Sequence, residues 1–175
     1  MIKKLKSNKG FTFIEMLVCV VTMLLIAMIC SVGLDMASKS YRESVFESNC
    51  QMLEATVDMQ VGDILRFATS VQTDASGNVT TFTNKTYRVN KGKIEVSTRS
   101  GDTGGYFLVY LEEDATDGYM ILNKSAYADS MYIENFVLSY DDATGMFSGS
   151  YTIKSSQLSG LKRDCTYAYR TAVNY

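Results

Sequence analysis

An uncharged apolar segment near the N-terminus constrains this chain more than any other feature. Residues 16–34 carry no charge, and residues 11–34 carry only one, on Glu15. As a helix, this longer stretch would extend about 36 Å, which is enough to cross a hydrocarbon core of about 30 Å. Residues 11–34 are therefore predicted to form a transmembrane helix.

The charges on either side of this segment predict its orientation. Four lysines and no acidic residue stand in the first ten positions, and Asp35 follows the segment. A lysine excess keeps the preceding end in the cytoplasm, so residues 35–175 are expected outside the membrane. Residues 11–175 carry thirteen lysines and arginines against nineteen acidic residues, a formal charge of −6. That balance argues against direct binding of nucleic acid, whose phosphates need a positive face.

The composition argues against the common forms of catalysis. The chain of 175 residues has no histidine, which excludes Ser-His-Asp, Cys-His and histidine–zinc sites, and its four cysteines form no CxxC pair. No serine has a recognisable general base beside it in a motif. We therefore expect no enzyme activity, no cofactor and no metal centre. The length predicts one domain, and 46% hydrophobic residues are enough to form a core.

The sequence fits an apolar segment that stays in the mature protein better than one that is removed as a signal peptide. A secretory signal has an apolar stretch of about 7–15 residues, which is shorter than the one here. A lipoprotein signal needs a small residue before its cysteine, whereas Cys19 and Cys30 follow Val18 and Ile29. Glu15 alone leaves two interpretations open: a functional intramembrane acid, or a side chain near the helix start that reaches headgroup water.

The residues around Glu15 form a recognisable string. Residues 9–18 read KGFTFIEMLV, which resembles the prepilin cleavage and N-methylation signature of type IV pilins and pseudopilins. The resemblance implies that an aspartyl prepilin peptidase removes residues 1–10 as a leader, cutting between Gly10 and Phe11. It also implies that Phe11 becomes the methylated N-terminus and that the apolar helix is kept.

Glu15 occupies the fifth mature position, where the signature has a glutamate. The resemblance implies an assembly role, in which the Glu15 carboxylate pairs with the new ammonium of Phe11 in a neighbouring subunit and sets the register. Burying both charges together is tolerable, whereas leaving either unpaired costs several kcal/mol. Two departures are an apolar exchange at Phe13, where leucine is commoner, and the absence of proline from the helix.

The resemblance implies an α+β pilin-like fold, with a long N-terminal helix packed on a C-terminal antiparallel sheet. The implied function is a structural subunit, a minor pilin or pseudopilin, stored in the membrane and then extracted into a cell-surface or periplasmic filament. Its implied partners are other pilin subunits, the prepilin peptidase, a membrane platform protein and a cytoplasmic ATPase. The sequence leaves open whether the filament serves adhesion, DNA uptake, competence, type II secretion or motility. The alternative is an uncleaved, membrane-anchored binding or sensor domain, and an extracytoplasmic hydrolase is a weaker third interpretation.

The periodicity beyond residue 35 agrees with this organisation. Apolar residues recur every three or four positions, as on one face of a helix, at Phe46, Cys50, Leu53, Val57, Val61, Ile64 and Ala68. The helix is therefore predicted to continue to about residue 68, with Gly62 as a candidate bend. From residue 79 onward, short apolar runs alternate with turn residues, which predicts an antiparallel sheet whose inner face covers the helix stripe.

Three hairpins are predicted in this sheet. Residues 86–89 and 94–96 flank a turn at 90–93, residues 106–111 and 119–122 flank an acidic loop, and residues 136–140 and 147–153 flank another. The acidic runs at 74–77, 114–118 and 142–145 are interpreted as turns that aspartate opens and a left-handed glycine closes. A weak calcium site near Glu112, Glu113, Asp114 and Asp117 is the lesser alternative.

The last two features are the outer cysteines and the C-terminal segment. Cys50 and Cys165 both lie beyond the membrane segment, where a disulfide can form, but burial on the helix stripe explains Cys50 equally well. A bond between them stays a candidate. Residues 162–170 contain three cations and two tyrosines and are interpreted as an edge strand, with a DNA-contacting strip as the lesser alternative.

Overall fold

The computed structural model describes residues 12–98, 104–128, 131–158 and 160–172. These residues fall into two compact units that divide between Ser44 and Val45, and each unit is described by itself. The first unit consists of helix, and the second contains further helix and all of the strands.

In the first unit, the helix α1 (Phe13–Arg66) supplies the apolar segment. It is long and apolar enough to cross a membrane by length and composition. Every residue from 12 to 44 is exposed, and the helix is uninterrupted at Gly33. The predicted transmembrane segment is thus helical throughout its described part, and the described residues of this unit leave its apolar side chains exposed.

In the second unit, α1 is amphipathic as predicted. Its buried side chains include every predicted position within the helix, namely Phe46, Cys50, Leu53, Val57, Val61 and Ile64. Ala68 is also buried, just beyond the last helical residue, Arg66. The helix continues through Gly62 without ending, so the candidate bend does not interrupt it. A Cβ at Gly62 would lie 3.1 Å from the ring of Tyr169. Gly62 therefore provides space for this tyrosine.

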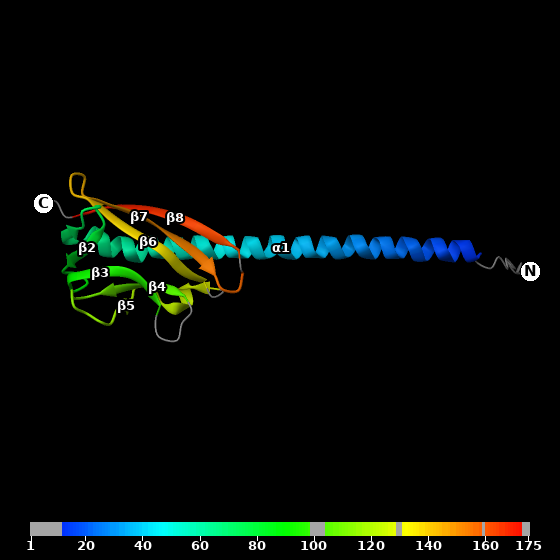
Figure 1. Cartoon of the computed structure of the whole chain (residues 1–175), viewed down its shortest axis with the longest axis horizontal. Helices are drawn as coiled ribbons and strands as arrows, with labels where there is room; N and C mark the ends of the chain where they lie inside the picture. The colour runs from blue at the N-terminus through cyan, green and yellow to red at the C-terminus, as the bar shows by residue number, and fades with distance from the viewer. Residues whose placement is uncertain (1–11, 99–103, 129–130, 159, 173–175) are drawn as a thin grey trace, which may run out of the picture. The chain divides into compact units, whose positions relative to one another are not determined.

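The strands form one antiparallel sheet over this part of α1 (Figure 1). They are β1 (Thr69–Thr73), β2 (Val79–Asn84), β3 (Val89–Thr98), β4 (Gly105–Tyr110), β5 (Tyr119–Met120), β6 (Met131–Asp141), β7 (Met146–Ser155) and β8 (Lys162–Arg170). Their order across the sheet is β1-β2-β3-β4-β6-β7-β8, with β5 paired to β4 off this path. A short 3-10 helix, η1 (Lys124–Ala126), lies between β5 and β6. The α+β fold class is confirmed.

The core lies between the helix stripe and the inner face of the sheet. The sheet contributes fully buried aromatic and aliphatic side chains, among them Phe107, Ile133, Phe147, Tyr151 and Ile153. Rings meet edge-on, as where Phe107 and Tyr151 lie 5.4 Å apart between centroids. Two of the predicted hairpins are confirmed, since β6 pairs with β7 and β4 pairs with β5.

The predicted turn at residues 90–93 is wrong. These residues belong to β3, and the turn lies at residues 85–88, between β2 and β3. Asn84 determines its place, because its side-chain oxygen accepts hydrogen bonds from the backbone N–H groups of Thr86 and Tyr87. Gly92 does not serve a turn. It lets the backbone of β3 lie close to β4, since a Cβ at this position would collide with the carbonyl of Tyr110. The strand β1 was also not expected.

Candidate functional site

Glu15 lies at the first turn of α1, where it forms a capping box with Thr12. The backbone N–H and the hydroxyl of Thr12 donate to Glu15 Oε2 at 2.8 and 2.9 Å, and the Glu15 N–H donates back to Thr12 Oγ1 at 3.4 Å. This local role was not expected, although the Thr-x-x-Glu pattern signals it. The predicted cleavage and methylation residues, Gly10 and Phe11, lie outside the described residues.

The first unit presents an apolar surface around the rest of the helix. Met23, Leu24, Ile26, Met28 and Ile29 are each at least 60% exposed. Cys19 and Cys30 are exposed free thiols within this surface, as expected for small apolar side chains. Water would be a poor solvent for such a helix, whereas lipid or other apolar helices would suit it.

In the second unit, Arg163 of β8 clamps the strand to α1. Its two terminal nitrogens donate to the carboxylates of Glu47 and Glu54, the latter at 2.8 Å. These glutamates are seven residues apart, so they lie on the same face of the helix. Hydrogen bonding to them raises the pKa of Arg163 still further, which keeps the guanidinium charged. The clamp links positions more than a hundred residues apart and could not be predicted from periodicity.

Cys50 and Cys165 lie beside this clamp, and both are free thiols in the core. Their side chains are 0% and 2% exposed. Burial raises the pKa of both thiols, that of Cys50 to about 12, and the nearby Glu47 and Cys165 also raise the pKa of Cys50. Both predicted cysteines are therefore placed at the interface between α1 and β8, and the candidate bond between them stays a prediction.

No protein-family model, curated protein or solved structure matches this chain.

The C-terminal segment is the edge strand that its pattern predicts. Cys165, Tyr167 and Tyr169 are buried on one face of β8, while the residues between them are exposed. The Tyr169 hydroxyl donates to Asp58 of α1 at 2.7 Å, a second link between strand and helix. The aromatic rings are thus committed to the core.

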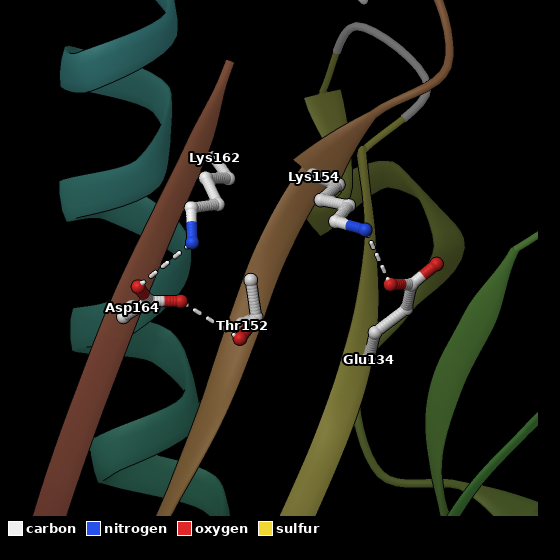
Figure 2. A network of polar contacts seen from close by, with 5 residues as sticks. All are labelled: Glu134, Thr152, Lys154, Lys162 and Asp164. Carbon is white, nitrogen blue, oxygen red and sulfur yellow. Dashed lines mark hydrogen bonds and ion pairs between the residues drawn. The ribbon is translucent and has the colours of Figure 1, made fainter. Parts of the chain in front are cut away.

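The exposed face of β6, β7 and β8 carries two ion pairs, one between β7 and β6 and one within β8 (Figure 2). Lys154 donates to Glu134 at 2.7 Å, and this contact raises the pKa of Lys154. Asp164 accepts from the Thr152 hydroxyl at 2.8 Å and lies 3.5 Å from the Lys162 ammonium, so its pKa is below the usual range. The Lys154–Glu134 pair and the Thr152–Asp164 hydrogen bond each link neighbouring strands, whereas Lys154 and Lys162 stand opposite each other as like charges.

Two of the acidic runs form the predicted turns. Asp74 accepts from the N–H groups of Asn78 and Ser76, both at 2.8 Å, and Asp141 accepts from the Thr144 hydroxyl at 2.7 Å and from the Ala143 N–H at 3.0 Å. These hydrogen bonds lower the pKa of both aspartates. The second of these turns opens at Asp141, one residue earlier than predicted.

Each acidic run was predicted to end in a glycine with a left-handed backbone conformation, and this is confirmed for two of the three glycines. Gly77 and Gly145 have φ of 82° and 65°, in the left-handed region. Gly118 does not have a positive φ, so the prediction is wrong there. Its role is close packing, because a Cβ at Gly118 would lie 2.9 Å from the side chain of Leu108.

The described residues give no support to the calcium alternative near Glu112, Glu113, Asp114 and Asp117. No group of three acidic, cysteine or histidine side chains in that part of the chain is close enough to hold a metal ion.

A groove of about 750 Å³ is lined by residues of β3 and β6. The strand between them, β4, pairs with β6 at Gly105 and Ile133. Two carboxylates line the groove, Glu95 and Glu134, and each contacts a lysine at 2.7 Å. A groove of this size could admit a small ligand or a peptide segment.

Proposed function

We propose that this chain is a minor pilin or pseudopilin, a structural subunit of a type IV pilus-like filament. The observation that carries the proposal is the position of Glu15, the single charge of the apolar helix, five residues after the glycine of a prepilin-type signature. The proposed leader, residues 1–10, is removed by prepilin peptidase, and the helix remains as the anchor and later as the filament core.

The exposed apolar surface of α1 in the first unit supports this proposal. Such a helix is stable in lipid before assembly, and it is equally stable against similar helices in a filament core. Because lipid and protein are both apolar, moving between them yields little hydrophobic gain. Specific polar contacts must then direct assembly, and the Glu15 carboxylate is the group available in that segment.

The capping box gives Glu15 a partner before assembly. In the membrane-stored subunit, the N–H and hydroxyl of Thr12 satisfy the carboxylate locally. In the proposed filament, the ammonium of Phe11 from a neighbouring subunit adds a charged partner. Loss of one partner of a buried ion pair costs about 3 to 5 kcal/mol, so the register contact should dominate incorporation.

The experiment compares Glu15→Ala and Glu15→Gln in a host that assembles the filament, with sheared filaments quantified by immunoblot. Glutamine keeps an oxygen that can accept from Thr12 but lacks the charge, so it separates capping from ion pairing. We expect both variants to be processed normally and to fall more than 10-fold in the sheared fraction. Glu43→Ala, an exposed acid of the same helix, should behave as wild type. Normal incorporation of Glu15→Gln would contradict the register role.

The second candidate is an uncleaved, membrane-anchored binding or sensor domain. It is favoured by the groove between β3 and β6 and by the capping box, which explains Glu15 without any neighbouring subunit. In this case the leader stays attached, and Glu15→Gln leaves the protein in the membrane unchanged. The state of the N-terminus separates the two candidates.

A further inference from the structure

The contacts between β8 and α1 place Cys165 directly over one short stretch of the helix. Arg163, two residues before Cys165 on the same face of the strand, reaches both Glu47 and Glu54. Tyr169, four residues after Cys165, reaches Asp58. Cys165 therefore faces α1 between the helix positions 47 and 58.

Cys50 is an inward-facing residue of that stretch. It lies about 4.5 Å along the helix axis from Glu47 and about 6 Å from Glu54, between the two carboxylates that hold Arg163. Both thiols are in the core, and the charge that Cys165 would carry as a thiolate is felt at Cys50. The two thiols therefore face the same interface from opposite layers, one on α1 and one on β8.

We propose that Cys50 and Cys165 are an oxidation site, joined by a disulfide that covalently fastens β8 to α1. The proposal rests on the placement of residues 35–175 outside the cytoplasm and not on filament assembly. The oxidant is a protein disulfide or oxidised glutathione, whose own disulfide bond breaks as the bond between Cys50 and Cys165 forms. One cysteine thiolate attacks the oxidant's disulfide and forms a mixed disulfide. The second thiolate then attacks that bond, closing Cys50 Sγ to Cys165 Sγ and releasing the oxidant as two thiols.

The fold also determines when this reaction can occur. In the folded unit both thiols are sealed from solvent, with Arg163 and its glutamates at the edge of the interface. Burial raises the pKa of both, so the reactive thiolate is scarce at neutral pH. Oxidation therefore takes place during folding, before α1 docks against β8, and the finished bond is protected from reductants for the same reason.

The test uses the full chain in detergent, reduced, unfolded in urea and refolded with oxidised glutathione. Free thiols are then blocked with N-ethylmaleimide, and the protein is digested with trypsin without reduction. Cleavage at lysines and arginines puts Cys50 in the peptide 43–66 and Cys165 in the peptide 164–170. Cys19 and Cys30 share the peptide 10–39, so a bond between Cys50 and Cys165 differs in mass from any bond that involves Cys19 or Cys30.

We expect peptides 43–66 and 164–170 to be linked, and to separate on reduction. Cys165→Ala should abolish this linked species and serves as the assignment control. Native reduced protein, given the same oxidant without urea, should form the bond at least 10-fold more slowly. Linkage of the native protein at the refolding rate would overturn the proposed order of events.

A second measurement needs no refolding. Protein taken directly from cells that export it is denatured in N-ethylmaleimide and mapped in the same way. Recovery of the linked pair supports the proposal whether or not the chain enters filaments. Full alkylation of Cys50 and Cys165, or linkage of either to the peptide that carries Cys19 and Cys30 (10–39, or 11–39 after removal of the leader), would overturn it and would leave the pilin proposal unaffected.

Discussion

Asn84 ties the C-terminal end of α1 to the turn between β2 and β3, and its removal should destabilise the second unit. The side chain is 0% exposed. Its amide nitrogen donates to the carbonyl of Ile64 at 2.6 Å, while its oxygen accepts from the N–H groups of Thr86 and Tyr87 at 2.9 and 3.1 Å. One amide thus serves both a helix end and a turn.

The size of the effect follows from these three hydrogen bonds. Asn84→Ala leaves the buried Ile64 carbonyl without this donor, which costs about 1 to 3 kcal/mol, and each lost turn bond costs about 0.5 to 1 kcal/mol when water can replace it. We expect a loss of about 3 kcal/mol in the free energy of unfolding. For a folded unit of about 130 residues, this loss lowers Tm by roughly 10 °C.

The assay is thermal and urea unfolding of the full chain in detergent, followed by near-ultraviolet circular dichroism of the buried tyrosines. Asn90→Ala is the matched control, because Asn90 is exposed and its backbone N–H, not its side chain, bonds to Leu111. We expect it to stay within about 0.5 kcal/mol of wild type. A loss below 1 kcal/mol for Asn84→Ala, or one equal to the control, would refute the reasoning.

Three further predictions concern single substitutions in the strands, each with a control where the chain offers one. Arg163→Ala should lower the free energy of unfolding in urea by about 1 to 2 kcal/mol, because the clamp is only partly exposed, whereas Arg170→Ala at the end of the strand should cost at most about 0.5 kcal/mol. The pKa of Asp164 is lowered in the fold by a threonine hydroxyl and then by a lysine, so its stabilisation is complete above the unfolded value of about 3.9 and is lost as the pH falls through the lower folded pKa. The difference in urea midpoint between wild type and Asp164→Asn should therefore shrink from pH 5 to pH 2, and a constant difference would contradict this. Gly92→Ala should cost more than about 2 kcal/mol in urea unfolding because its methyl group would collide with a strand carbonyl, whereas Gly33→Ala, with open space around it, should not destabilise the chain.

Elements governed by local patterns could be predicted from the sequence. The helix stripe was visible because burial repeats every three or four residues, and each of its predicted positions from Phe46 to Ile64 is buried. The hairpin of β6 and β7 was visible because alternating strands flank an Asp-to-Gly turn. In both cases the physical signal lies within a few neighbouring residues.

Features governed by contacts distant in sequence could not be predicted. The hydrogen bond by which Asn84 holds the end of α1 reaches Ile64, twenty residues earlier. The clamp of Arg163 depends on partners 116 and 109 residues away. The Thr12–Glu15 capping box is different, since its four-residue pattern is local and visible in the sequence. Glu15 was interpreted there as part of the prepilin signature and not as a helix cap.

The mass of the mature N-terminal peptide tests the central claim most directly. Protein is extracted from membranes and from sheared filaments, and its N-terminal peptide is sequenced by tandem mass spectrometry. The account predicts a chain that lacks residues 1–10 and begins at Phe11 with one added methyl group, with the apolar helix intact. A chain that retains Met1, or one that begins beyond residue 34, would contradict it.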